Sequence, residues 1–152
     1  MIFPKDDLPV WGADFVSLPG NKNLLLLDAQ PVGGDVDCSP AFRDWYDTHI
    51  PDFPWGGDLP EPVQQYVSKY ALWSRLENFD DSSTEEQLYE AFCQHLSLYL
   101  DLVVTNTAGG TLECQDYVKY RLENDPARPM LKRLYGEEWT EHVLENLLFP
   151  SL

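Results

Sequence analysis

Residues 8–31 read LPVWGADFVSLPGNKNLLLLDAQP, with one short apolar run on each side of a turn-forming Pro-Gly-Asn sequence. The first run includes Phe15, Val16 and Leu18, and the second consists of the four leucines at 24–27. Short apolar runs separated by proline, glycine and asparagine are typical of a β-hairpin. The sequence therefore predicts two antiparallel strands joined by a loop over residues 19–23.

One acidic residue, Asp14, lies inside the first predicted strand. Because side chains alternate between the two faces of a strand, we expect Asp14, Val16 and Leu18 on one face and Phe15 on the other. A carboxylate on a partly apolar face costs free energy unless its pKa rises or a cation neutralises it. Asp14 is therefore a candidate for proton transfer, and the alternative is half of a structural ion pair.

The chain is strongly acidic: its 152 residues include 10 Lys and Arg against 26 Asp and Glu, a formal charge of -16 at pH 7. This balance disfavours nucleic acid and anionic membranes as partners, because both are bound through Lys and Arg. Three widely spaced cysteines indicate neither a disulfide framework nor a zinc site, and they fit a reducing compartment. The three histidines lack metal-ligand spacing, so we expect core or solvated roles for them and no bound metal.

The rest of the chain predicts one further strand and several helices. Residues 70–76 are rich in aromatic and apolar residues, which favours a strand, and they carry one cation, Arg75. Helical spacing predicts a short helix after Ser39, a long helix from about Ser82 to Gly109, and helices over 112–123, 127–135 and 138–148. Early strands followed by late helices predict an antiparallel sheet covered by helices.

Common catalytic patterns are absent from the sequence. The Gly-Gly pairs at 33–34 and 109–110 do not match phosphate-binding fingerprints, and no Gly-x-Ser-x-Gly motif occurs. Dehydrogenase, kinase and hydrolase functions are therefore disfavoured. Asp125, which precedes a proline, has a structural interpretation as the N-cap of the helix over 127–135, and this role is compatible with a second role as an acid.

Six separated motifs resemble, in the same order, those of the ferredoxin-dependent bilin reductases: residues 8–19, 24–31, 52–57, 72–75, 124–128 and 147–150. The resemblance implies an α/β fold, a three-layer α/β/α sandwich with a central antiparallel sheet. It also implies that residues 1–152 form a single domain, corresponding to the C-terminal two-thirds of the family domain. Family members carry additional N-terminal sequence, so the sheet is expected to be incomplete on that side.

The resemblance implies reduction of an open-chain tetrapyrrole, with electrons delivered singly by a reduced 2Fe-2S ferredoxin and with no bound cofactor. It is closest to the members that form phycoerythrobilin, which implies reduction of the A-ring diene of 15,16-dihydrobiliverdin. Two alternatives stay open: a noncatalytic bilin-binding or escort protein, and reduction of biliverdin as in phytochromobilin synthase. The expected protein is a soluble monomer of an algal plastid stroma or a cyanobacterial cytoplasm, and a second bilin reductase is a further partner for substrate transfer.

The resemblance also assigns roles to individual residues. Asp14 resembles the sheet aspartate that protonates the bilin, and Asp125 resembles the helix-side aspartate that acts with it. Arg75 resembles the strand arginine that binds a propionate, which a guanidinium can hold through two hydrogen bonds. Arg128 is a second candidate for binding a propionate.

Ferredoxins of this type are acidic, so docking on an acidic chain should require clustered cations. Half of all the Lys and Arg residues lie between 119 and 133. The predicted docking residues are Lys119, Arg121, Lys132 and Arg133.

Overall fold

The computed structural model describes residues 8–31, 40–59, 61–77, 82–105, 114–125 and 127–150. The chain divides into two compact units, Met1–Gly110 and Thr111–Leu152, and each is described by itself. The single domain expected over residues 1–152 stays a prediction.

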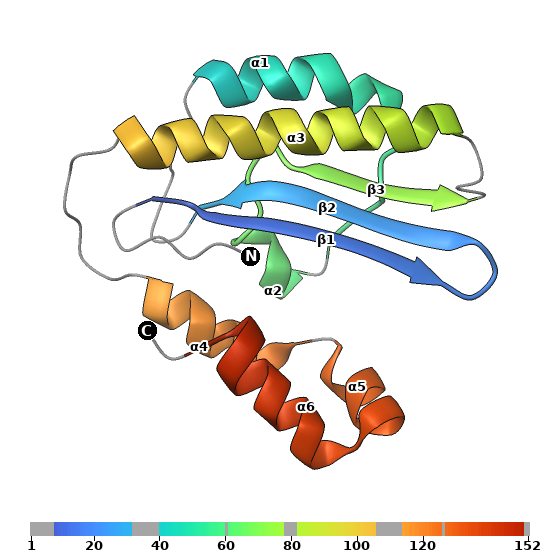
Figure 1. Cartoon of the computed structure of the whole chain (residues 1–152), viewed down its shortest axis with the longest axis vertical. Coiled ribbons are helices and arrows are strands. Elements are labelled where there is room, and N and C mark those ends of the chain that lie inside the picture. Colours follow the sequence, from blue (N-terminus) through green and yellow to red (C-terminus); the bar gives the residue numbers. More distant parts are fainter. Residues whose placement is uncertain are drawn as a thin grey trace. The chain divides into compact units, whose positions relative to one another are not determined.

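The first unit contains an antiparallel sheet of three strands in the order β1-β2-β3 (Figure 1). Its strands are β1 (Val10–Leu18), β2 (Lys22–Gln30) and β3 (Leu72–Glu77). The predicted hairpin is confirmed, but its loop is shorter than expected and spans residues 19–21. Gly20 and Asn21 have φ angles of 83° and 60°, a left-handed conformation that glycine and asparagine tolerate best. The tight turn is therefore encoded by these two residues.

Two helices, α1 (Pro40–His49) and α3 (Ser82–Thr105), lie on the same side of the sheet (Figure 1). The buried residues of α3 recur every three or four positions, which places them on one side of the helix. They are Leu88, Ala91, His95 and Tyr99. The indole Nε1 of Trp45 on α1 donates a hydrogen bond of 3.0 Å to the carbonyl of Ala91. The expected helix signals Ser39 and Gly109 fall outside the described residues.

Short helical segments connect these elements: a 3-10 turn at Ile50–Asp52 and α2 at Glu61–Gln64. Trp55, which follows the 3-10 turn, forms an isolated β-bridge with Ser74 of β3.

A buried histidine joins the sheet to the helices. His95 on α3 is 1% exposed, and its Nδ1 accepts a hydrogen bond of 2.9 Å from the indole Nε1 of Trp11 on β1. The rings of Phe42 and Trp45 on α1 pack edge-on against it. Burial lowers the pKa of His95 to about 3. The imidazole is therefore a neutral core group, one of the two roles expected for the histidines.

The second unit is helical and consists of α4 (Cys114–Asn124), α5 (Arg128–Tyr135), α6 (Glu137–Val143) and a π-helical turn at Leu144–Leu148. The three helices predicted in this part of the sequence are confirmed to within one or two residues at most ends. The last one differs in kind, because its final turn is π-helical. The buried residues of this unit include Tyr117, Val118, Thr140, Leu144 and Phe149.

Candidate functional site

The strand register separates the sheet into two faces. Trp11, Ala13 and Phe15 of β1 face α3 across a shared pocket, so the alternate residues of the sheet project from the opposite side. We call this opposite side the outer face. Its members include Asp14 and Val16 on β1, Leu24, Leu26 and Asp28 on β2, and Trp73 and Arg75 on β3.

Asp14 stands on the outer face as predicted, but it is exposed rather than buried. Asp14 pairs with Leu26 of β2, which in turn pairs with Trp73 of β3; these three residues form one row across the sheet. Val16, its neighbour on the same face of β1, is 40% exposed, so water reaches this part of the sheet. The expected cost of burying the Asp14 carboxylate therefore does not arise. Its alternative role in a structural ion pair has no support among the described residues.

Arg75 lies one row from Asp14 on the same face, opposite Leu24. Its guanidinium carbon is 5.3 Å from the centre of the Trp73 ring, within cation–π distance. The Trp73 indole Nε1 donates a 2.8 Å hydrogen bond to the carbonyl of Gly57, which fixes the ring. A Cβ on Gly56 would come within 2.6 Å of that ring, so the glycine permits this close packing. Arg75 is thus supported on an aromatic ring while its side chain remains exposed.

A third charged residue of the outer face, Asp28, was missed by the sequence reasoning. Asp28 is fully buried, and burial raises the pKa of its carboxyl to about 7. The backbone amide of Ser68 donates a 2.8 Å hydrogen bond to Oδ2, and the Ser68 hydroxyl donates to Oδ1. The signal was present in the sequence, because Asp28 directly follows four leucines and lies at an outer-face position of the predicted strand.

Asp125 belongs to the second unit and is 8% exposed. Its Oδ2 lies 3.4 Å from Nη2 of Arg121, and its Oδ1 accepts a 2.8 Å hydrogen bond from the amide of Ala127. The predicted N-cap position is wrong by two residues, because the cap of α5 is Ala127. The reason is a turn closed by the Arg128 amide and the Asp125 carbonyl, after which the helix begins. The Asp125 side chain still stabilises the start of α5 through its hydrogen bond with the Ala127 amide.

Two of the predicted binding cations, Arg128 and Lys132, already form ion pairs within the second unit. The guanidinium of Arg128 contacts the carboxylate of Glu141 and donates to the carbonyl of Leu122. Lys132 Nζ lies 2.8 Å from Glu141 Oε1 and 2.9 Å from Glu137 Oε1. These contacts, with Glu141 contributing most, raise the pKa of Lys132. A partner or a propionate would therefore have to compete with Glu141 for both cations.

The other three predicted docking cations differ in accessibility. The side chain of Arg121 is 18% exposed, pairs with Asp125 and lies 5.3 Å from the centre of the Phe149 ring. Lys119 and Arg133 are exposed. A large acidic partner can therefore approach Lys119 and Arg133 more readily than Arg121.

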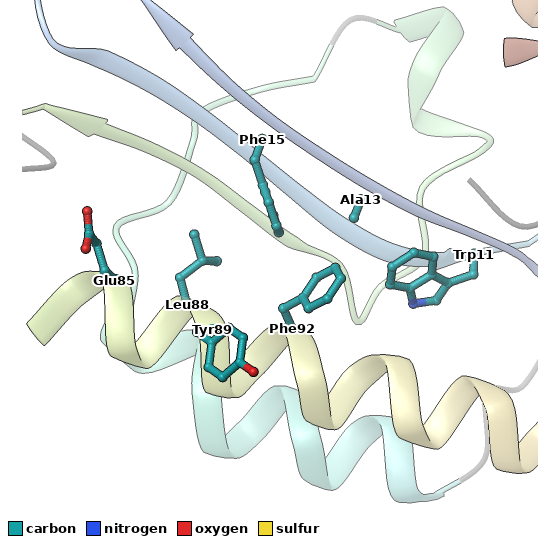
Figure 2. Close-up of a pocket in the computed structure, with 7 residues that line it drawn as sticks. All are labelled: Trp11, Ala13, Phe15, Glu85, Leu88, Tyr89 and Phe92. Carbon is teal, nitrogen blue, oxygen red and sulfur yellow. The ribbon is translucent and has the colours of Figure 1, made fainter. Parts of the chain in front are cut away.

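A separate apolar pocket of about 550 Å³ opens on the helix side of the sheet, between β1 and α3 (Figure 2). Its lining is Trp11, Ala13, Phe15, Glu85, Leu88, Tyr89 and Phe92. The Phe92 ring packs edge-on against Trp11 and Phe15, at centroid distances of 5.6 and 5.8 Å. Asp14 and Arg75 project from the other face, so this pocket contains neither of them.

The described residues contain neither a membrane-spanning helix nor a metal-binding cluster. No helix there is long and apolar enough to cross a lipid bilayer. The same residues contain no group of three or more His, Cys, Asp or Glu that could hold a metal ion.

Known proteins with similar sequences include two cyanobacterial enzymes named phycoerythrobilin:ferredoxin oxidoreductase. The one from Nostoc punctiforme is 37% identical over 166 residues, covering 98% of this chain and 63% of the relative. The one from Parasynechococcus marenigrum is 42% identical over 161 residues, covering 94% of this chain and 60% of the relative. The chain therefore spans about three-fifths of the length of these relatives.

A solved structure has the same fold. The crystal structure of phytochromobilin synthase from tomato, in complex with biliverdin, matches with a TM-score of 0.77 and 26% sequence identity. The match covers 96% of this chain and 56% of that chain. The predicted α/β fold class with an antiparallel sheet is confirmed. A family model described as "Ferredoxin-dependent bilin reductase" matches residues 1–150, and the chain belongs to this family.

Proposed function

We propose that this chain reduces an open-chain tetrapyrrole with electrons from ferredoxin, and that its reaction is reduction of the A-ring diene of 15,16-dihydrobiliverdin. The names of the cyanobacterial relatives support this choice of substrate class. The main structural support is the outer face, where the exposed carboxylate of Asp14 and the supported guanidinium of Arg75 stand on one largely apolar surface. Strand spacing and rise separate their Cα atoms by roughly 12 Å.

Each residue has a distinct task in the proposed reaction. Two electrons arrive singly, and each adds negative charge to the bilin, so a proton delivered to the tetrapyrrole stabilises the reduced product. Asp14 delivers one proton, and Asp125 is the second proposed acid. Arg75 binds a propionate and orients the ligand, because a guanidinium and a carboxylate form strong charge-assisted hydrogen bonds.

Arg75→Gln tests the proposed binding mode. We expect roughly a 10- to 100-fold loss of bilin affinity, because a hydrogen bond to a charged group contributes about 1.5–3 kcal/mol. The measurement is an absorbance titration of the chain with the free-acid bilin and with its dimethyl ester, which has no carboxylates. Affinity for the ester should be nearly unchanged by the substitution.

Arg43→Gln is the matched control, because Arg43 lies on α1 and its side chain is 59% exposed. The Arg43→Gln substitution also removes one positive charge, but on a helix that covers the opposite side of the sheet from the outer face. Equal affinities of wild type and Arg75→Gln for the free acid would show that Arg75 does not bind a propionate. Absence of bilin binding by the wild type would contradict the proposed function itself.

Ferredoxin docking is proposed for cations of the second unit, chiefly the exposed Lys119 and Arg133, together with Lys132, which precedes Arg133 in α5. Arg133→Glu should lower the ferredoxin association rate and flatten its dependence on salt, since surface charges steer association. Arg43→Glu changes the net charge equally and should have a smaller effect. The measurement is stopped-flow reduction across a salt series. Equal effects of the two substitutions would mean that net charge alone, and not this surface, controls association.

A further inference from the structure

Asp28 and Asp14 are close neighbours on the outer face. Asp14 pairs with Leu26, and Asp28 lies two residues further along β2, on the same face. Such diagonal neighbours in an antiparallel pair are about 7–8 Å apart, a distance that one or two water molecules can bridge. The residue of β1 opposite Asp28 is Gly12, so no side chain of β1 fills the space beside the Asp28 carboxyl.

The surroundings of Asp28 keep a proton available near neutral pH. Full burial raises the pKa of its carboxyl to about 7. Hydrogen bonds from Ser68 and the Ala29 amide lower it, so the ionised form is also supported. The charged residues nearest in the strand register or chain are Asp14 on β1, Arg75 on β3 and Lys69 next to Ser68. Both protonation states are thus accessible under ordinary conditions.

Ser68 also connects Asp28 to solvent. It lines an open pocket of about 330 Å³ that includes Trp55, Asp58 and Trp73. The hydroxyl that donates to Asp28 Oδ1 can therefore relay a proton between water in this pocket and the buried carboxyl. Asp28 can therefore supply a proton to Asp14 on one side and be reprotonated through Ser68 from the pocket on the other.

We propose that Asp28 stores a proton behind the outer face and passes it to Asp14 after Asp14 has protonated the bilin, an inference that rests on the proposed function. Once the bound bilin covers the outer face and shields Asp14 from bulk water, the proton leaves the Asp28 carboxyl, crosses bridging water and binds the Asp14 carboxylate. Asp28 is left as a carboxylate that accepts hydrogen bonds from Ser68, and a proton from solvent then restores it. Asp28 acts through Asp14 and does not contact the bilin.

An infrared pH titration of the chain without bilin tests the proton store. A protonated-carboxyl band should disappear with a midpoint near pH 7 in the wild type and should be absent in Asp28→Asn. Ser68→Ala removes a donor that stabilises the carboxylate, so it should move the midpoint to higher pH. Asp44→Asn, on the exposed surface of α1, should leave the band unchanged. Absence of this band, or its loss in Asp14→Asn instead, would overturn the inference.

The rate of repeated bilin reduction against pH tests the supply of protons. The wild-type profile should show a step near pH 7 that moves upward in Ser68→Ala and is missing in Asp28→Asn. A structural role alone would change the rate at all pH values without removing the step. An unchanged profile in both variants would refute proton supply by Asp28. Failure of the wild type to reduce bilin, with the infrared band present, would instead refute the proposed function and the supply step with it, while leaving the proton store established.

Discussion

Asp14→Asn is expected to lower the rate of bilin reduction by roughly 10²- to 10⁴-fold, the usual contribution of a positioned proton donor. A carboxamide keeps the shape of the side chain but has no acidic proton. Because Asp14 is exposed, the substitution should change folding and bilin affinity little. The measurement is anaerobic reduction with reduced ferredoxin, together with a bilin titration of the same variant. Asp44→Asn on α1 serves as the control, and a wild-type rate in Asp14→Asn would refute the proposed donor.

Asp125→Asn should also reduce turnover, but it carries a structural cost that must be separated from the catalytic effect. The substitution leaves the guanidinium of Arg121 without its carboxylate in a mostly buried position, which can cost about 3–5 kcal/mol. The double variant Arg121→Gln with Asp125→Asn removes the unpaired charge and should recover part of the melting temperature. If turnover recovers with stability, Asp125 is a structural residue. Continued loss of turnover in a stable double variant supports the role of an acid.

Asp28→Asn is expected to stabilise the chain above pH 7, by an amount on the order of 4 kcal/mol, from the change in pKa at 1.36 kcal/mol per pH unit. In the folded chain the pKa of Asp28 is about 7, against an ordinary value of 3.8. Between these values the folded state binds a proton that the unfolded state has released. Wild-type stability therefore falls as pH rises through this window and stays lower above it. Asparagine removes the penalty of burying a charge and can still accept a hydrogen bond from Ser68.

The measurement is urea unfolding of both proteins at a series of pH values, with the difference in free energy of unfolding plotted against pH. The difference is needed because His95 acts in the opposite direction. Burial lowers its pKa from 6.5 to about 3, so its contribution to stability is lost as pH falls through that range. This contribution is common to both proteins and cancels in the difference. A difference that does not change with pH would contradict the burial cost assigned to Asp28.

The sequence predicted the sheet well because its signals are local. Four leucines, an alternating strand and the Gly20-Asn21 turn specify the hairpin without help from distant residues. The alternation also placed Asp14 and Phe15 on opposite faces correctly. The exposure of Asp14 could not be predicted, because the accessibility of a sheet face depends on which segments cover it. Covering segments are set by tertiary packing and leave no periodic signal in the strand.

The partners of Arg128, Lys132 and Asp28 also could not be predicted from the local sequence. The sequence places Arg128 and Lys132 one helical turn apart, but only the fold brings Glu141 against both of them. Asp28 is buried by contact with Ser68, 40 residues away in the chain. Proximity in sequence identified the cluster of basic residues, whereas the partners of each member depend on contacts between elements. The predicted ligand and docking roles therefore remain to be tested by the substitutions above.

The position of β1 at the edge of the described sheet bears on how the chain behaves in concentrated solution. Its nine residues contain no lysine, arginine or proline, which natural edge strands commonly use to prevent pairing with other chains. Phe15, Val16 and Leu18 are all more than a third exposed on this strand. Aggregation through this edge is opposed by repulsion between molecules of formal charge -16. Since salt screens that repulsion, colloidal stability of the described chain should depend on ionic strength.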